Sequence, residues 1–254
     1  RRDRYAQSYW KVRHRKGVKL LDAQKLMRQR NYFGAMMVNE GEADAIITGY
    51  TRNYASVIRP ILELIGMTDG VSRIAAANLM LTKRGPMFLA DTTINIDPTA
   101  EQLAKISQLT ASLAKIFNIK PNIAMLSFSN FGASTTNNST KIAQAIKTIH
   151  QNFPKVVIDG EIQADFALNP EMLKKEFPFS KLVDKKVNVL IFPNLDSANI
   201  TYKMMKELYD AESIGPIIMG LKKPAHILQL GASVDEMINM TAVAVIDAQE
   251  KAKF

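Results

Sequence analysis

Polar side chains that could bind an anion follow several short apolar runs of this sequence. After Ile123–Phe128 come twelve residues rich in hydroxyls and amides, Ser129–Thr140, and then a helical pattern. Backbone N–H groups and hydroxyls that open a helix can bind a phosphate. The GxxxxGK(S/T) pattern of a Walker A loop is absent. A polar surface loop with Ser139 or Asn138 as helix cap is an equally good interpretation.

Three further polar segments follow predicted strands. Ile158–Asp165 contains three carboxylates, which could bind a metal or exchange protons. An Asp at a strand end more often caps a helix or holds a turn, and we favour that interpretation here. Phe192–Lys203 is typical of a strand, a polar turn and a helix start, where Lys203 could meet a phosphate or extend into solvent. Gly215–Pro224 ends a strand in Gly and two lysines, which could form a second anion-binding edge or only a turn.

Several classes of site are excluded by residue type. The chain has no Cys, so disulfides, thiolate zinc sites, iron–sulfur clusters and a cysteine nucleophile are ruled out. The three His residues are far apart, and we predict no metal site. GxSxG, HExxH and GxGxxG are absent. No run approaches the roughly 20 apolar residues of a membrane span, and the charged N-terminus is no secretory signal. We therefore expect a cytoplasmic protein.

Positive charge is concentrated at the N-terminus. The 254 residues carry a formal net charge of +9. Residues 1–30 contain eleven basic and two acidic side chains, which leaves 22 of each kind in the remaining 224 residues. The charge excess therefore describes one terminal segment and not a broad basic face, so neither a nucleic acid nor a membrane is an expected partner.

The elements that would position the polar segments alternate regularly. Their short apolar runs are typical of parallel strands with helices on both faces, and the βα order predicts an α/β fold. The clearest helix starts at Asp97-Pro98, an N-cap acid before a Pro at the first helical position, and stops before Pro121. The other predicted helices are Leu20–Asn39, Tyr54–Leu64, Lys141–Gln151, Asn199–Tyr209 and Val234–Ala252. The predicted strands are Ala43–Thr48, Met87–Ala90, Ile123–Phe128, Val156–Asp159, Val187–Phe192 and Pro216–Gly220.

Several colinear segments that span essentially the whole chain form a pattern: Met36–Val38, Gly41, Ala43-Asp44, Arg59-Pro60, Ala90-Asp91, Asp97–Ala104, Ala124–Ser129, Asp159-Gly160 with Gln163 and Asp165, Ile191–Pro193, Asn199–Lys203 and Gly215–Leu221. Together they resemble the phosphate acetyltransferase (phosphotransacetylase) family. This resemblance implies two α/β lobes, with mainly parallel sheets and helices on both faces, around a central cleft that binds coenzyme A. The first lobe would be residues 1–70 plus 218–254, with its N-terminal part missing, and the second 71–217.

The resemblance also implies which residues bind the ligand. Arg13 and Arg59 match family arginines near the coenzyme and phosphate site, so we expect them to contact an anion. Asn199 and Lys203 could instead only hold a helix start. The full set expected to bind acetyl-CoA or an anion is Arg13, Arg59, Ser127, Ser129, Asp165, Asn199, Lys203 and Gln229.

One departure from the family pattern bears on catalysis. Family transferases carry Asn-Asp-Leu-Ser-Arg-Gly after a Lys-Pro, and its Ser and Arg belong to the catalytic apparatus. Here Gln229 and Leu230 occupy those two positions, His226 and Ile227 replace Asn and Asp, and a later Asp is Glu236. Leu cannot make the charge-assisted contact of a guanidinium, and a loss of roughly 3 kcal/mol in the transition state means over a hundredfold in rate. We predict no catalytic residue and no useful transferase activity.

The altered pattern is similar to the C-terminal domain of hybrid NADP-dependent malic enzymes, especially at Ser197–Asn199, Gln229–Ser233 and Ala242–Gln249. This resemblance implies that acetyl-CoA binds as an allosteric inhibitor of NADP-dependent decarboxylation of malate to pyruvate. NADP and a divalent metal would bind in a malic enzyme domain of the same polypeptide, outside these residues. A homodimer or higher homo-oligomer is implied. The alternatives are an active transferase that moves acetyl between CoA and phosphate, and an assembly module without a ligand.

Overall fold

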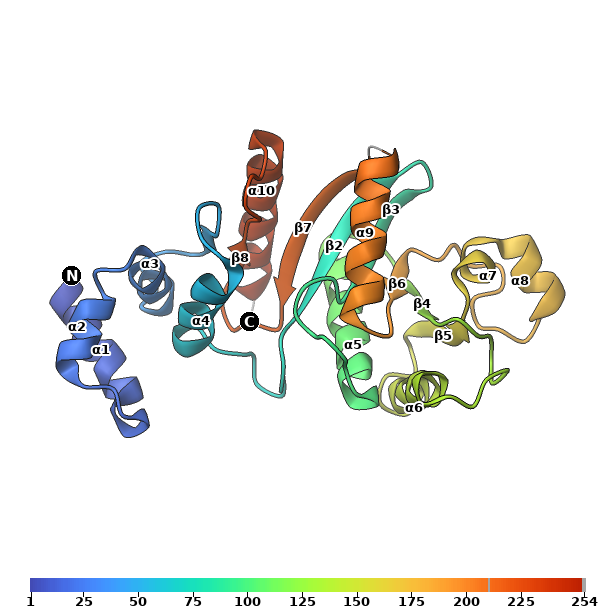
Figure 1. The fold of residues 1–254 in the computed structure, drawn as a ribbon, viewed down its shortest axis with the longest axis horizontal. Helices are drawn as coiled ribbons and strands as arrows, with labels where there is room; N and C mark the ends of the chain where they lie inside the picture. The colour runs from blue at the N-terminus through green and yellow to red at the C-terminus, as the bar shows by residue number, and fades with distance from the viewer. Residues whose placement is uncertain (210, 253–254) are drawn as a thin grey trace. The chain divides into compact units, whose positions relative to one another are not determined.

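The computed structural model describes residues 1–209 and 211–252 and divides the chain into two compact units. The first unit is Arg1–Ser72 together with the segment from Gly220 onward, and the second is Arg73–Met219 (Figure 1). Each contains helices and a β-sheet, which confirms the predicted α/β class. Within the described ranges, no helix combines the length and apolarity that a bilayer span requires.

The first unit is mostly helical around one pair of strands. Its two strands run parallel and pair Ile47 with His226. Tyr5, Tyr9 and Met36 lie in a buried cluster contributed by the N-terminal helices. The elements are α1 (Arg2–Arg13), a 3-10 turn (His14–Lys16), α2 (Leu20–Leu26), α3 (Arg30–Asn39), β1 (Ile46–Thr48), α4 (Tyr54–Leu64), β8 (Ala225–Ile227) and α10 (Val234–Lys251).

The prediction of one helix over Leu20–Asn39 was wrong, because the chain forms α2 and α3 with a turn between them. Ala23 in α2 and Met36 in α3 belong to the same buried cluster. In one straight helix they would lie about 20 Å apart along the axis. The change of direction therefore lets both residues reach one core, which local helical periodicity does not reveal.

The second unit is built on a six-stranded mixed sheet in the order β5-β4-β6-β3-β2-β7. The first four strands in this order run parallel, whereas β2 is antiparallel to both of its neighbours. The elements are β2 (Ala75–Thr82), β3 (Gly85–Ala90), α5 (Ala100–Ile116), β4 (Asn122–Leu126), α6 (Asn137–Asn152), β5 (Val157–Ile162), α7 (Ala164–Leu168), α8 (Pro170–Glu176), β6 (Val189–Ile191), α9 (Leu195–Tyr209) and β7 (Glu212–Met219).

Helices cover both faces of this sheet, as alternation along β3 shows. Leu89 points to the face where α9 packs through Tyr202, in a cluster that includes Leu190. Phe88, its neighbour in the strand, contacts the ring of Phe117 at the end of α5. Successive side chains of a strand point to opposite faces, so α5 and α9 lie on different sides of β3 (Figure 1).

Three predicted helix starts need correction. Helix α9 begins at Leu195 and not at Asn199, so Asn199 lies one turn inside the helix. The helix after Asp97-Pro98 begins at Ala100, with Thr99 as N-cap in a capping box with Gln102. Thr99 satisfies a free N–H of the first turn, which leaves Asp97 for a contact with Lys141. The cap of α6 is Thr136, not Asn138 or Ser139, because the helix already begins at Asn137.

Candidate functional site

Arg13 and Arg59 line one pocket in the first unit, formed by α1, α2, α3 and α4 and by the turn after α1. Arg13 ends α1, and Arg59 lies in the middle of α4, so the packing of the N-terminal helices brings the two guanidinium groups to one place. The cavity measures about 470 Å³, within the range of small-molecule sites. Lys16, Ser56 and Gln29 add further polar groups to its wall.

A single carboxylate, Glu63 of α4, joins both arginines. Its Oε1 accepts from Arg59 Nε at 2.9 Å and lies 3.4 Å from Arg13 Nη2. Its Oε2 accepts from the hydroxyls of Tyr9 and Tyr32, each at 2.9 Å. Burial alone would raise the pKa of Glu63, but the hydrogen bonds from Arg59 and the two tyrosines and the charge of Arg13 hold it below its ordinary value. Glu63 is therefore an anion at neutral pH.

The pocket retains an excess of positive charge. Its lining has three basic side chains, Arg13, Lys16 and Arg59, against the acids Asp22 and Glu63. The guanidinium Nε of Arg13 is buried and has no hydrogen-bond partner in the described part of the chain. Two guanidinium groups that line one cavity favour a ligand that brings acceptor oxygens, such as a phosphate.

In the second unit, the expected ligand residues follow the carboxyl ends of neighbouring parallel strands. Ser127 and Ser129 follow β4, Asp165 follows β5, and Asn199 and Lys203 follow β6. Strands β4 and β6 are adjacent in the sheet. In open α/β sheets, ligands bind outside the carboxyl ends of the strands, so this edge is where a ligand of this unit is expected.

The two serines differ in their contacts. The Oγ of Ser127 is buried and has no partner among the described residues, so it can accept or donate one further bond. Ser129 is already engaged, because its Oγ lies 2.9 Å from that of Ser139 and 3.4 Å from Glu161 Oε1. Glu161 also accepts from the N–H of Gly132 at 2.8 Å. The buried carboxylate of Glu161 therefore holds the polar loop in place, which favours a structural role for that loop's first half.

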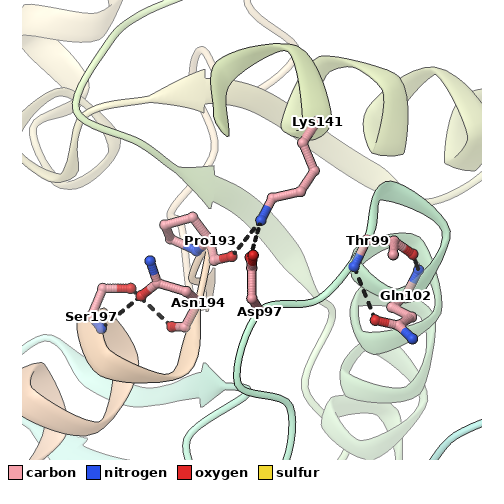
Figure 2. A network of polar contacts seen from close by, with 7 residues as sticks. All are labelled: Asp97, Thr99, Gln102, Lys141, Pro193, Asn194 and Ser197. Atoms are coloured by element: carbon pink, nitrogen blue, oxygen red, sulfur yellow. Dashed lines mark hydrogen bonds and ion pairs between the residues drawn. The ribbon is translucent and has the colours of Figure 1, made fainter. Parts of the chain in front are cut away.

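Lys141 of α6 connects two of the loops at this edge (Figure 2). Its Nζ donates to Asp97 Oδ1 at 2.7 Å and to the carbonyl of Pro193 at 3.2 Å. Next to Pro193, Asn194 accepts from the N–H of Ser197 at 3.0 Å and so caps the start of α9. The loops after β3 and β6 are thus held at fixed positions relative to α6.

Asn199 and Asp165 have structural contacts, and Lys203 has no ion pair with any residue in the ranges that the structure describes. Asn199 Nδ2 donates to the carbonyl of Thr92 at 3.0 Å, which ties α9 to the loop after β3. The exposed Asp165 accepts from the N–H of Phe166 at the start of α7. The ammonium of Lys203 lies over the ring of Tyr202, 5.6 Å from its centroid, on an exposed part of α9.

The loop after β3 depends on a buried carboxylate. Asp91 accepts from the backbone N–H groups of Thr93, Ile94 and Asn95, at 2.9, 3.0 and 3.2 Å, and from the side chain of Asn95. Burial raises the pKa of Asp91, and these hydrogen bonds only partly offset that effect.

The segment after β8 carries Gln229 and Leu230, the two residues that the sequence comparison with the family motif expects at its catalytic positions. Gln229 is exposed and its carbonyl accepts from Ala232 N, and the side chain of Leu230 is 68% exposed. Glu236 forms a capping box with Ser233 at the start of α10, and so has a structural role. The apolar side chain of Leu230 offers no hydrogen-bond donor to an anion.

His226 is fully buried in β8, and its Nε2 lies 3.5 Å from Asp247 Oδ2 in α10. Burial would raise the pKa of Asp247, but the neighbouring His226 and Lys251 lower it overall. Lys223 donates to the last carbonyls of α3, and Lys222 pairs with Asp69 at 3.0 Å. These lysines therefore form a structural turn, which favours the simpler of the two interpretations of their segment.

The expected ligand residues fall into separate groups. Arg13 and Arg59 share the pocket of the first unit, and Gln229 lies elsewhere in that unit's sequence, after β8. The other five belong to the second unit. Glu63, Tyr9 and Tyr32 were not predicted. The spacing of Arg59 and Glu63, four residues apart on one helix, could have indicated the ion pair, whereas the tyrosines come from other helices.

Comparisons with known proteins agree on one family. Residues 1–245 match the family described as phosphate acetyl/butaryl transferase. The NADP-dependent malic enzyme of Escherichia coli (strain K12) is 37% identical over 247 residues, which cover 96% of this chain and 32% of that protein. The phosphate acetyltransferase of Bacillus subtilis (strain 168) is 34% identical over 93% of this chain and 73% of its own length.

A solved structure supports the same assignment. The crystal structure of a phosphotransacetylase from Streptococcus pyogenes has a TM-score of 0.91 and 37% identity, and the match covers 100% of this chain and 76% of that one. This chain spans about a third of the malic enzymes it matches. The chain belongs to the phosphate acetyl/butaryl transferase family.

Proposed function

We propose that this chain binds CoA or acetyl-CoA, with phosphate groups of the ligand at the pocket that Arg13 and Arg59 line. The observation that carries this proposal is the pairing of two guanidinium groups, those of Arg13 and Arg59, in one cavity. A phosphate supplies acceptor oxygens for both, and charge-assisted hydrogen bonds of this kind are stronger than neutral ones. Membership of the family supports the choice of a CoA ligand.

We further propose that the chain binds this ligand without efficient acetyl transfer. Gln229 and the exposed Leu230 occupy the positions where family transferases carry Ser and Arg. A site that keeps its affinity and lacks its catalytic groups acts as a receptor. As part of a malic enzyme, it would inhibit if acetyl-CoA bound one state of the assembly more tightly than another.

A second candidate is an active phosphate acetyltransferase. The comparisons favour it, because proteins named phosphate acetyltransferase match as much of the chain as the malic enzymes do, and the Streptococcus pyogenes phosphotransacetylase matches all of it. In that case side chains other than those at 229 and 230 would stabilise the transferring group.

Acetyl phosphate formation from acetyl-CoA and inorganic phosphate separates the two candidates. A receptor gives no turnover above the background of an Arg13→Ala variant purified in the same way. Robust turnover that Arg13→Ala abolishes would establish the transferase and exclude the silent receptor. Since Arg13 belongs to the proposed ligand pocket, this variant also identifies activity from a contaminating enzyme, which the substitution would leave unchanged.

The remaining expectations stay predictions. NADP and a divalent metal are expected only in a malic enzyme domain outside these residues, which would convert malate to pyruvate. A homodimer or larger homo-oligomer and the malic enzyme domain are the expected protein partners, and a cytoplasmic location is expected.

A further inference from the structure

Glu63 has an unusual position, because a carboxylate occupies the wall of a pocket proposed to bind anions. Its side chain is only 11% exposed and has donors from three helices: Tyr9 and Arg13 of α1, Tyr32 of α3, and Arg59 of α4. The function proposed above, binding of CoA phosphates by Arg13 and Arg59, gives Glu63 no role. Its oxygens bind the same guanidinium groups that a phosphate ligand would use.

The two oxygens of Glu63 have different partners. Oε2 accepts from the tyrosine hydroxyls, its only donors among the described residues, whereas Oε1 faces the two arginines. Burial and the adjacent Glu63 raise the pKa of both Tyr9 and Tyr32 above the ordinary value, so both phenols stay protonated donors. A ligand can therefore draw on the arginines without releasing Glu63, since the tyrosines keep the carboxylate in place.

Arg59 is held at one end of its guanidinium. The bond to Glu63 uses Nε, and its side chain is 75% exposed. Among the described residues Arg59 has no other hydrogen bond, so its two Nη groups remain available to a ligand. Arg13 and Arg59 together therefore offer donors to an anion, while Glu63 offsets one of their two positive charges.

We infer that Glu63 is a specificity-determining residue of this site, whose negative charge weakens the binding of anions by an amount that increases with ligand charge. The inference rests on the proposed anion function of the pocket. A fixed negative charge a few ångströms from the ligand repels each ligand charge in proportion to its size. With Glu63 present, the affinities for a phosphate and a polyphosphate differ less. Selectivity between ligands then depends more on contacts with their uncharged parts.

Glu63→Gln isolates this charge, because the amide preserves the shape of the carboxylate. Its oxygen can face Arg59 Nε and Arg13, and its NH₂ can donate to the phenol oxygens, which also accept hydrogen bonds. Glu42→Gln is a matched control. Glu42 also pairs with two arginines, Arg1 and Arg4, and accepts from a tyrosine, Tyr5, but it does not line the pocket.

The test is a calorimetric titration of wild type, Glu63→Gln and Glu42→Gln with phosphate, pyrophosphate, dephospho-CoA and CoA, at low and high salt. We expect Glu63→Gln to tighten CoA binding roughly three- to tenfold at low salt, with a smaller gain for dephospho-CoA. The affinity for pyrophosphate should increase more than the affinity for phosphate, and high salt should reduce each increase. Glu42→Gln should bind all four ligands as wild type does.

A tyrosine titration by ultraviolet absorbance provides an independent readout. In Glu63→Gln the phenol titration should move down toward the ordinary pKa of about 10, which shows that the charge has been removed from a folded pocket. Unchanged or weaker anion binding in a variant with this shift would overturn the inference. If wild type binds pyrophosphate but not CoA, the proposed function fails and the pyrophosphate series still decides the role of Glu63. If neither protein binds any of the four anions, both proposals fail.

Discussion

Arg13→Ala should weaken CoA binding more than Arg59→Ala does. The side chain of Arg13 is 20% exposed and that of Arg59 is 75% exposed, so an anion bound by Arg13 is better shielded from water. A hydrogen bond to a charged group contributes about 1.5–3 kcal/mol when it is shielded from water. Taking about 2 kcal/mol for Arg13, the dissociation constant should rise roughly 30-fold. Water screens the charge of the exposed Arg59, so Arg59→Ala should lose clearly less CoA affinity than Arg13→Ala.

Isothermal titration calorimetry with CoA at constant ionic strength measures both variants directly. Arg2→Ala is the charge-matched control, because Arg2 is exposed at the other end of α1 and does not line the pocket. It should bind CoA within a factor of about two of wild type, since a distant exposed charge is largely screened. If Arg59→Ala lost more affinity than Arg13→Ala, or if Arg2→Ala lost as much as Arg13→Ala, burial would not be the property that makes Arg13 important.

Three further predictions concern stability, measured by urea denaturation. Lys141→Met should lower the free energy of unfolding by about 1 kcal/mol, because it removes the hydrogen bonds to Asp97 and Pro193. An unchanged urea midpoint would show that these two bonds do not stabilise the fold. Asp91→Asn should lower the free energy of unfolding by about 1–3 kcal/mol, because the new NH₂ group would face backbone N–H donors that the carboxylate accepts from. A variant as stable as wild type would contradict this. Because the pKa of Asp247 is lower in the folded state than in the unfolded state, its ionised carboxylate stabilises the fold. This contribution is present above the unfolded pKa of about 3.9 and is lost as the pH falls below that value. Asp247→Asn should reduce that acid loss, and an identical pH profile would refute the assignment.

Local patterns were sufficient for elements whose apolar spacing matches their final burial. Tyr54–Leu64 is a helix as predicted, and each of the six predicted strands overlaps an observed one. Strand β2 was missed because its alanine-rich first half does not have the composition of a strand, and only pairing with β3 and β7 makes it one. Strand β8 is three residues long and depends on its pairing with β1.

The candidate site was predictable only where a family motif includes the residue. Arg13 and Arg59 were found through resemblance, and nothing in their local sequence indicates that they meet. Glu63 and its tyrosines are brought together by the packing of three helices, so no local spacing predicts the complete cluster. The polar segment from Ser129 looked equally suited to binding and to structure, and the contact with buried Glu161 favours structure for its first half.

The most direct test of the central proposal is a titration of this chain with acetyl-CoA, followed by calorimetry and by thermal unfolding. Saturable binding with a rise in melting temperature that grows with ligand concentration is the predicted result, because a ligand that binds only the folded state stabilises it. Arg13→Ala should lose most of both effects. No heat of binding and no shift in melting temperature at millimolar acetyl-CoA would contradict the proposal and favour an assembly module without a ligand.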